Sequence, residues 1–539
     1  HETGHNLDDR AVARRHPRCR NRAAPHAVGE TGGKMATSDN LASIVVGHAP
    51  DSIAIISRGR PTTYAELLSQ IRRFRGGLQG IGVNRGDRVA LLAANGRHFA
   101  VAYLAAVGMG AVAVPLNPAV TADELEREIN DVSAKVVVVG PSAMPVWKRF
   151  AADHVPSVEH VIVSDPSAEI TGAVSFDDLV ATGAEIPEAV VHPNDLAVLI
   201  FTSGTAGAPR AAMLSHGNLL SNVSQTLAAT PMHSDDISFG VLPMFHIFGL
   251  NVMFDCVIAS GGTIVLVERF DPSSAIETIT ERGITVVAGA PAMWSALAQM
   301  PNVDHDSMQS VRLAVTGAAK MPEDMAELLF TKCGVALVEG YGLTEASPVV
   351  TTGLVTNGDV LTPRGSIGVP LRDVEVRLVD EDGDDALPGD DGEIWVKGPN
   401  VFLGYWNDSE ATGRVLTPDG WLRTGDVAVA DDNGNLFIVD RMKDLIIVSG
   451  FNVYPAEVEA VIAKQPGVQA CAVVGVAHPH TGEAVKAYVV AEKGVYLDED
   501  AVIDHARKKL SRYKCPSKVQ FVEELPVNAT GKVLRRALH

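Results

Sequence analysis

The feature of this sequence that most restricts its fold is a repeated alternation of short, mostly apolar segments with longer amphipathic ones. The alternation begins near Leu41: residues 88–93 and 134–139 are rich in Val, Leu and Ala, whereas 64–78 and 122–132 have the periodicity of surface helices. Strands that are apolar along nearly their whole length are buried on both faces, as in parallel sheets covered by helices. The sequence therefore predicts an α/β fold with layered parallel sheets.

The individual elements follow from the same pattern. Strands are predicted at 53–56, 88–93, 111–114 (ending at Pro115), 134–139, 264–267, 286–288 and 313–315. Helices are predicted at 64–78, 99–107 and 122–132, the last with Thr121 as its N-cap. After about Leu361, short strands at 374–379, 393–396 and 436–439 are separated by Gly, Asp and Pro, which indicates a β-rich subdomain. A further βα alternation fills the last hundred residues or so.

The chain of 539 residues is too long for one hydrophobic core, so several domains are expected. We predict a disordered or non-native N-terminal extension at 1–34, a large domain at 35–440 with its β-rich subdomain at about 361–440, and a small, mobile α+β domain at 441–539. The extension is arginine-rich and poor in apolar residues. It is either a transit peptide or, the interpretation we favour, upstream or cloning-derived sequence before a natural start at Met35.

Composition narrows the function classes. The net charge of −20 argues against nucleic-acid binding, which usually requires a basic surface. The five scattered cysteines form no CxxC pair, which indicates neither a disulfide framework nor a zinc site. No apolar run reaches the roughly 18 residues that a membrane-spanning helix needs. A cytoplasmic protein is expected, with peripheral membrane contact still open.

Small and hydroxyl-bearing residues form the first chemical motif, directly after the apolar run 196–201. They are Thr202, Ser203, Gly204, Thr205, Ala206 and Gly207, followed by Pro209 and Arg210. Such a loop can fold tightly and direct backbone N–H groups and hydroxyls at one anion, with Arg210 adding positive charge. The alternative is a flexible Ser/Gly turn between a strand and a helix.

Further motifs follow this loop in a fixed order. They are TGAAKMP (316–322), EGYGLTEASP (339–348), WLRTGDVA (421–428), DRMKDLIIVSGFNVYPAEVE (440–459) and NATGKVLRRAL (528–538). Together they resemble the motifs of the adenylate-forming superfamily of acyl-CoA synthetases, luciferases and peptide-synthetase adenylation domains. The resemblance covers about 500 residues. The chain departs from it at Ala206, where the superfamily has Thr or Ser, and at Arg210 and Ala211, where it has Lys-Gly.

The resemblance implies an ATP-binding and catalytic site. Its ATP- and AMP-binding residues would be Thr202, Ser203, Gly204, Thr205, Ala206, Gly207, Gly317, Ala318, Ala319, Glu339, Gly340, Tyr341, Gly342, Thr344, Asp426 and Arg441. Tyr341 would stack on adenine, and Asp426, expected after a Thr-Gly turn, would bind the ribose with Arg441. Glu345 would bind Mg²⁺, a hard cation that prefers oxygen ligands. The catalytic residues would be Lys532, Thr344, Glu345 and Arg210.

Other positions are assigned to coenzyme A, the hinge and the acyl pocket by the same resemblance. The coenzyme A and hinge residues would be Lys443, Ser449, Gly450 and Phe451. The acyl pocket would include His246, Phe248 and Trp294, although His246 and Trp294 can equally be core residues. The segment 392–406 matches a structural motif of the superfamily, and we assign it no chemistry.

The predicted function is that of an ATP-dependent acyl-CoA synthetase that uses ATP, Mg²⁺ and coenzyme A. YGLTE followed by Ala-Ser-Pro resembles the fatty-acyl branch, so a medium- or long-chain fatty acid is the expected substrate. The alternatives are an acyl-AMP ligase that loads a carrier protein, an aryl-acid–CoA ligase and a non-catalytic nucleotide-binding protein. A luciferase is disfavoured because luminous relatives have lysine where this chain has Ile447. A monomer or homodimer is expected.

Overall fold

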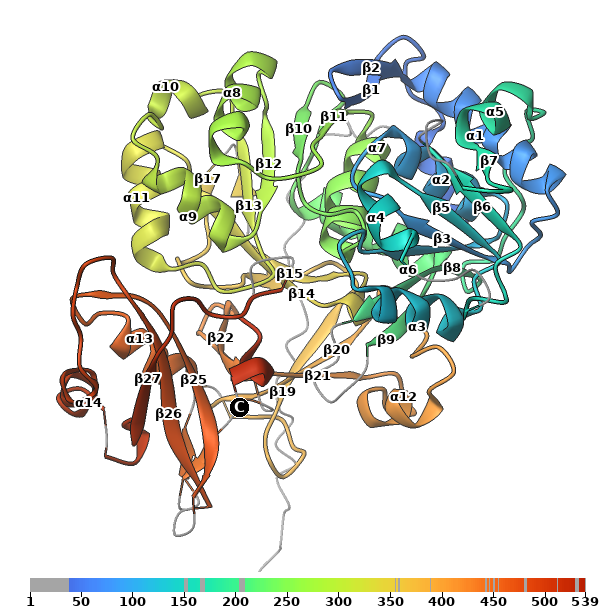
Figure 1. The fold of residues 1–539 in the computed structure, drawn as a ribbon. Helices are drawn as coiled ribbons and strands as arrows, with labels where there is room; N and C mark the ends of the chain where they lie inside the picture. Colours follow the sequence, from blue (N-terminus) through green and yellow to red (C-terminus); the bar gives the residue numbers. More distant parts are fainter. Residues whose placement is uncertain are drawn as a thin grey trace, which may run out of the picture. The chain divides into compact units, whose positions relative to one another are not determined.

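The computed structural model describes residues 38–149, 154–164, 170–202, 209–353, 355–356, 359–387, 389–441, 444, 446–448, 451–453, 455–478, 482–510, 512–528 and 533–538. Two sheets with mainly parallel strands carry most of the first 370 residues, and two further sheets follow them along the chain. Figure 1 gives the order of the elements by colour and label.

A seven-stranded sheet carries the first chemical motif at its edge. In order across the sheet, its strands are β7 (Val174–Ser175), β6 (His160–Val163), β5 (Val136–Val139), β3 (Arg88–Leu92), β4 (Val112–Leu116), β8 (Leu196–Thr202) and β9 (Arg210–Ser215). All neighbours are parallel except β8 and β9, which form an antiparallel hairpin. The motif at 202–207 therefore connects two paired strands.

Helices cover both faces of this sheet, as the apolar strands predict. The helices of this region are α1 (Tyr64–Gly80), α2 (Arg97–Gly108), α3 (Ala122–Val132), α4 (Met144–Trp147) and α5 (Phe176–Thr182). On β3, Ala90 and Leu92 pack in one core with α3 and α4, whereas Val89 and Leu91 pack in another with α1 and α2. Thr121 caps α3, as predicted, and accepts the Glu124 N–H.

A nine-stranded sheet carries the next two motifs. Its strands, in order, are β18 (Val369–Pro370), β15 (Val349–Thr352), β14 (Leu337–Gly342), β13 (Leu313–Thr316), β12 (Val286–Gly289), β10 (Ile237–Gly240), β11 (Thr263–Leu266), β1 (Ile53–Ser57) and β2 (Arg60–Thr63). The strands from β14 to β1 are parallel, and the outer pairs are antiparallel. The carboxyl ends of the parallel strands therefore meet at one edge.

The helices around this sheet fall into two groups. They are α6 (His216–Ala229), α7 (Cys256–Ser260), α8 (Pro272–Arg282), α9 (Pro291–Gln299), α10 (His305–Met308) and α11 (Glu323–Cys333), with a π-helical segment at Phe248–Asp255. Helices α8, α9, α10 and α11 share one core with Phe239 and Val287 of the sheet and gather beside β12 and β13 in Figure 1. The opposite face shares its core with α6, α7 and the seven-stranded sheet.

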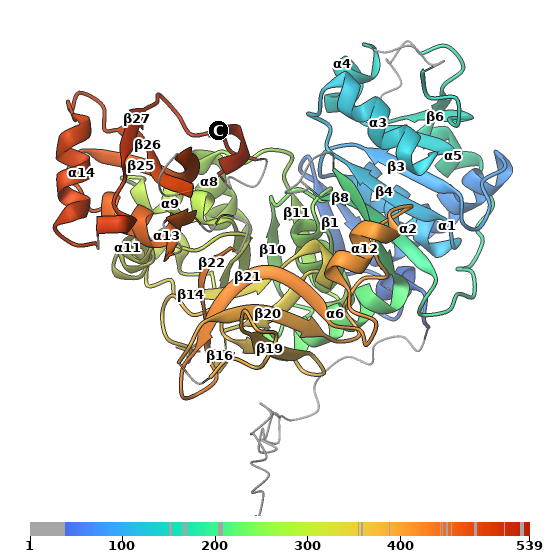
Figure 2. The same cartoon turned by 90° about the horizontal axis from the view of Figure 1, so that it is seen from below.

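The β-rich region contains an antiparallel four-stranded sheet, whose strands lie side by side in Figure 2. Its strands are β19 (Glu375–Val379), β20 (Gly392–Lys397), β21 (Leu422–Ala430) and β22 (Leu436–Arg441), with α12 (Ser409–Val415) between β20 and β21. A separate small hairpin pairs β16 (Val355–Thr356) with β17 (Asp359–Val360). The predicted strands at 374–379, 393–396 and 436–439 are confirmed within a few residues.

The C-terminal part of the chain has its own sheet and core. Its elements are β23 (Ile446–Val448), β24 (Phe451–Val453), α13 (Pro455–Ile462), β25 (Val468–His478), β26 (Gly482–Ala491), α14 (Glu499–Arg507) and β27 (Lys518–Phe521). The two helices pack on the sheet through Val458 and Val502, which contact a cluster of strand residues. This is the predicted α+β arrangement.

The α/β fold class is confirmed, one predicted strand end is wrong, and one strand was not predicted. Strand β4 continues through Pro115 to Leu116, because in a parallel pair Pro115 can still pair with Leu91 through its carbonyl group. The segment 210–215 forms strand β9, which was not predicted from the sequence. Its residues have low strand propensity, so pairing with β8 decides its conformation.

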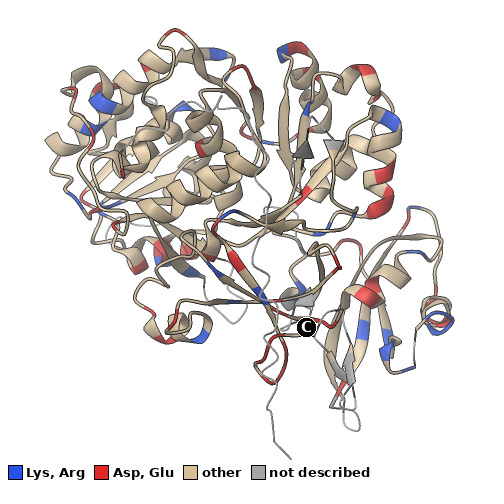
Figure 3. Cartoon of the chain, turned by 180° about the vertical axis from the view of Figure 1, so that it is seen from behind, with Lys and Arg blue, Asp and Glu red and all other residues tan. Residues whose placement is uncertain are grey.

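The strands of the two mainly parallel sheets are largely uncharged, and charged residues lie mainly on the helices and loops around them and on some strands of the two later sheets (Figure 3). This distribution fits a chain in which the parallel strands are buried on both faces. Among the described residues, no helix is both long enough and apolar enough to cross a membrane.

Candidate active site

Tyr341 and Asp426 bring two predicted ATP-binding motifs into direct contact. The Tyr341 hydroxyl, at the end of β14, donates a hydrogen bond of 2.7 Å to Oδ2 of Asp426 on β21. Asp426 is only 4% exposed. The prediction that Asp426 follows a turn is wrong, because it lies inside a strand. There it pairs across the sheet with Arg441 of β22, the other residue assigned to the ribose.

The predicted adenine wall lies between β13 and α11, as expected. Ala318 has a φ of 69°, a left-handed conformation that is uncommon for residues other than glycine. A Cβ atom added to Gly317 would lie 3.4 Å from Cζ of Phe248 and 3.5 Å from the carbonyl oxygen of Gly340. The turn at Gly317 and Ala318 thus packs closely against β14 and against Phe248, which is predicted to line the acyl pocket. Backbone strain at a loop after a parallel strand is typical of functional sites.

Glu339 lies on β14, two residues before Tyr341. Its Oε1 accepts the Gly365 N–H at 3.2 Å. Burial raises the pKa of the Glu339 carboxyl, and the Gly365 N–H partly opposes this shift. Glu339 therefore ties the strand to the following loop, and its predicted contact with ATP stays a prediction.

Thr344 and Glu345 lie on the short 3₁₀ turn Thr344–Ala346, directly after β14. Two buried asparagines hold the end of this turn. The Asn251 side chain donates to the Ser347 carbonyl at 2.6 Å, and the Asn400 side chain donates to the Ala346 carbonyl at 3.0 Å. Neither asparagine was predicted from the sequence. Each asparagine lies in an otherwise apolar segment of the sequence, and this could have indicated a supporting role, since buried amides are normally hydrogen-bonded.

The Glu345 carboxylate accepts a hydrogen bond from a tyrosine. The Tyr405 hydroxyl donates to Oε1 of Glu345 at 2.6 Å, and the Phe402 N–H donates to the Glu345 carbonyl at 2.9 Å. Burial and the neighbouring Glu345 charge raise the pKa of Tyr405, so it remains a hydroxyl donor. Tyr405 belongs to the segment 392–406, to which the sequence analysis assigned no chemistry.

The residues around Glu345 fit a magnesium ion that is bound by both the protein and the phosphates of ATP. Among the described residues, no group of three or more His, Cys, Asp or Glu side chains forms a metal cage. Mg²⁺ in phosphate-binding sites typically uses one or two carboxylates plus phosphate oxygens and water. Glu345 has the required donor chemistry, because it is a carboxylate whose Tyr405 partner is a neutral hydroxyl and does not itself neutralise its charge.

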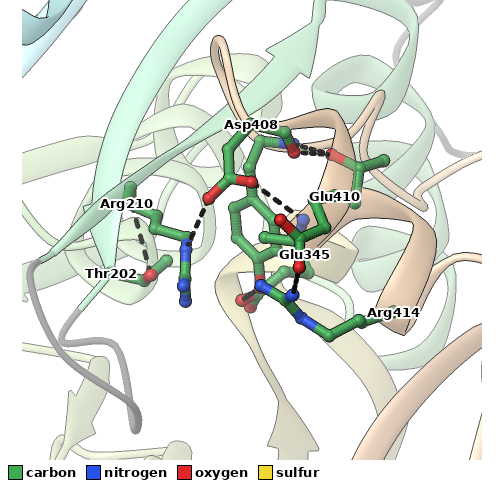
Figure 4. Close-up of polar contacts among 9 residues, drawn as sticks. Thr202, Arg210, Glu345, Asp408, Glu410 and Arg414 are labelled. Carbon is green, nitrogen blue, oxygen red and sulfur yellow. Dashed lines mark hydrogen bonds and ion pairs between the residues drawn. The ribbon is translucent and has the colours of Figure 1, made fainter.

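Arg210 begins β9, on the far side of the hairpin loop from Thr202. Its Nε donates to Oδ2 of Asp408 at 2.9 Å, and its guanidinium carbon lies 5.9 Å from the centre of the Tyr405 ring. The Thr202 hydroxyl donates to the Arg210 carbonyl at 3.3 Å. Figure 4 shows Arg210, Asp408 and Glu345 in one cluster of polar side chains. Ser203, Gly204, Thr205, Ala206 and Gly207 lie outside the described residues.

The three residues assigned to the acyl pocket differ in their surroundings. His246 is half-buried, and its Nδ1 accepts the Phe248 N–H at 3.2 Å. Phe248, 8% exposed, begins the π-helical segment, a feature often found at functional sites. Trp294 on α9 is fully buried, and its Nε1 donates to the Val315 carbonyl at 3.1 Å. Membership of the pocket stays a prediction for all three.

We expect the substitution Trp294→Ala to destabilise the protein. Removing a large buried aromatic side chain typically costs about 3–5 kcal/mol of unfolding free energy. Thermal denaturation followed by circular dichroism measures this loss, with Tyr496→Ala as a control because Tyr496 is 90% exposed. Unchanged stability together with an altered preference for acid chain length would instead place Trp294 in the pocket wall.

Several predicted residues cannot be placed by side chain. Lys443, Ser449, Gly450 and Lys532 lie outside the described residues. Phe451 is described through its backbone only, as the first residue of β24. The predicted coenzyme A and hinge residues thus stay predictions.

Comparison with known proteins gives matches over most of the chain. The family model described as AMP-binding enzyme matches residues 44–406, and the model described as AMP-binding enzyme C-terminal domain matches residues 457–532. A feruloyl-CoA synthase from Amycolatopsis sp is 38% identical over 487 residues, which cover 90% of this chain and 95% of that protein. A long-chain-fatty-acid–CoA ligase from Salmonella typhimurium is 36% identical over 521 residues, covering 90% and 91%.

A solved structure agrees with these matches. ATP-bound MatB from Rhodopseudomonas palustris superposes with a TM-score of 0.86 at 35% sequence identity, covering 93% of this chain and 98% of that chain. The two family models match one after the other along the chain, first the AMP-binding enzyme and then its C-terminal domain. On the extent of these matches, the chain belongs to the family of AMP-binding enzymes, within the adenylate-forming superfamily.

Proposed function

We propose that the protein is an acid–CoA ligase that forms an acyl-adenylate from ATP and transfers the acyl group to coenzyme A. The observation that carries the proposal is the network in which Tyr405 contacts both the Glu345 carboxylate and the Arg210 guanidinium. A carboxylate and a cation held near each other at the ends of β14 and β9 suit the binding of a metal–triphosphate.

In the first half-reaction, an oxygen of the acid's carboxylate attacks the α-phosphorus of ATP and pyrophosphate leaves. Both reactants are anions, so the site must neutralise charge and hold them in line. Arg210 and Lys532 supply positive charge, and Thr344 donates to the α-phosphate. Glu345 would hold Mg²⁺, which would supply positive charge against the phosphates. Tyr341 and Asp426 orient the nucleoside.

In the second half-reaction, the thiol sulfur of coenzyme A attacks the acyl carbon, the thiol proton passes to the surroundings, and AMP leaves with an oxygen from the original acid. We propose that the C-terminal domain, 441–539, turns between the two steps on a hinge at Lys443. The turn would withdraw Lys532 and bring Gly450 beside the thiol's path, where the missing Cβ leaves room for the pantetheine arm.

For the acid we propose a medium- or long-chain fatty acid, with an aryl acid as the alternative. The wording of residues 341–348 and the Salmonella relative's name support a fatty acid. The name of the Amycolatopsis relative, a feruloyl-CoA synthase, supports an aryl acid. Pyrophosphate release measured with acids of increasing chain length and with several aryl acids separates the two. If neither the fatty acids nor the aryl acids support pyrophosphate release, both substrate assignments are contradicted.

We expect the substitution Arg210→Lys to leave the enzyme active. Lysine keeps the positive charge but replaces a planar fork with a point charge. A lysine can still pair with Asp408, so KM for ATP should change more than kcat. Steady-state kinetics with varied ATP measures both constants. An inactive, folded Arg210→Lys enzyme would reveal a bidentate contact that only arginine provides.

A further inference from the structure

The segment Leu403–Asp408, which we call the strap, runs from the loop after β20 to the start of α12. It pairs with β9 through three backbone hydrogen bonds of 2.9, 2.9 and 2.8 Å, which involve Ala211 and Met213. Tyr405 forms an antiparallel bridge with Ala212. The strap is therefore fixed to the strand whose first residue is Arg210.

The middle of the strap, at Tyr405, contacts the turn that carries Glu345. The Tyr405 hydroxyl donates to the Glu345 carboxylate at 2.6 Å. The Tyr405 N–H, in turn, donates to the Thr412 hydroxyl of α12 at 2.9 Å. Because its backbone is held by β9 and α12, the Tyr405 ring has little freedom, and its hydroxyl defines one orientation of the Glu345 carboxylate.

The C-terminal end of the strap, at Asp408, contacts Arg210. Asp408 uses its two carboxylate oxygens separately: Oδ1 accepts the Ala411 N–H at 2.8 Å and caps α12, while Oδ2 accepts Nε of Arg210 at 2.9 Å. The Ala411 N–H and the Arg210 guanidinium lower the pKa of Asp408, so it is ionised at neutral pH. Asp408 thus joins Arg210 to the first turn of α12.

We propose that the strap is a positioning element for the ATP site, in which Tyr405 orients the metal-binding carboxylate of Glu345 and Asp408 orients the phosphate-binding guanidinium of Arg210. The identity of the ligands rests on the proposed function. A long arginine and a glutamate lose rotamer freedom when they bind a ligand, and a strap that orders them beforehand removes that cost. The strap also couples the two groups, because one backbone segment holds both.

The first test concerns Tyr405. The variant Tyr405→Phe keeps the ring and removes the hydroxyl. We expect Mn²⁺, a spectroscopic substitute for Mg²⁺, to bind the protein–ATP complex about 10-fold more weakly, the scale of one hydrogen bond to a charged group. Electron paramagnetic resonance of Mn²⁺ measures this affinity without turnover. In a Glu345→Gln background, Tyr405→Phe should have no further effect, because the two groups act as one unit.

The second test concerns Asp408. The variant Asp408→Asn keeps an N-cap side chain and removes the charge that holds Arg210. We expect metal-free ATP, measured by calorimetry in EDTA, to bind about 10-fold more weakly, as for a lost charge-assisted contact. In an Arg210→Ala background the same substitution should have no effect. Tyr405→Phe alone should leave metal-free ATP binding unchanged.

The matched control is Glu410→Gln on α12, which removes a carboxylate from an exposed ion pair with Arg414 and leaves the side chains of Tyr405 and Asp408 unchanged; Figure 4 shows this pair beside Asp408. It should change neither affinity. Additive effects in the two double-variant cycles, or weaker binding that only follows a loss of thermal stability, would overturn the proposal. If no acid supports pyrophosphate release by the wild-type protein, the proposed function fails, and the Mn²⁺ and ATP binding measurements still decide the role of the strap.

Discussion

Replacement of Glu345 by glutamine is expected to lower the rate of adenylate formation by at least about 100-fold, the scale of removing one electrostatic stabiliser from an active site. Glutamine keeps the shape of the side chain and can still accept the Tyr405 hydroxyl, so the turn after β14 should stay folded. It removes the anionic oxygen that a hard cation prefers. ATP–pyrophosphate exchange at several Mg²⁺ concentrations measures the loss.

The comparison with Glu410→Gln separates the metal role from a general effect of lost charge. Glu410 is exposed and pairs with Arg414 on α12, so its substitution should leave the exchange rate unchanged. Near-normal exchange by Glu345→Gln at limiting Mg²⁺ would remove Glu345 from the metal site and, with it, the assignment of the motif at 339–348.

The second large effect is that different substitutions should abolish different half-reactions. Lys532→Ala should lose adenylate formation and still convert supplied acyl-adenylate and coenzyme A to the thioester. Lys443→Pro should still form adenylate and lose thioester formation, because proline restricts the backbone freedom that the hinge requires. Gly450→Leu should behave like Lys443→Pro through steric block of the thiol's path. Exchange and thioester assays measure the two steps separately.

Circular dichroism of each variant is the control for folding. If all three folded variants lose both half-reactions equally, one fixed arrangement serves both steps. The separate roles of Lys532 and Gly450 would then be wrong, together with the proposed rotation of the C-terminal domain.

The fold class was predictable because burial on both faces leaves a strong mark on a strand. Residues 134–139 and 286–288 have few alternatives to a parallel sheet, and both are found there. Strand β9 was not predictable, since its sequence, RAAMLS, has no strong strand preference. Its partners β8 and the strap decide its conformation, and both pairings are tertiary contacts that local pattern does not encode.

The residues of the candidate site also fall into a group that the sequence predicted and a group that only the structure revealed. The resemblance of short motifs identified Tyr341, Glu345 and Asp426, because their chemistry is recognisable within a few residues of sequence. The contact between Tyr341 and Asp426 joins positions 85 residues apart, and the contact between Glu345 and Tyr405 joins positions 60 apart. No local pattern indicates such partners, so the supporting residues became visible only in the folded chain.

The central claim, that an acid oxygen attacks the α-phosphorus of ATP, is tested most directly by following that oxygen. The wild-type protein is incubated with ATP, coenzyme A and an acid labelled with oxygen-18 in its carboxylate, and the products are analysed by mass spectrometry. The account predicts acyl-CoA, unlabelled pyrophosphate and AMP that carries one labelled oxygen. Formation of ADP with the label in inorganic phosphate, or of acyl-CoA with unlabelled AMP, would contradict the adenylate route.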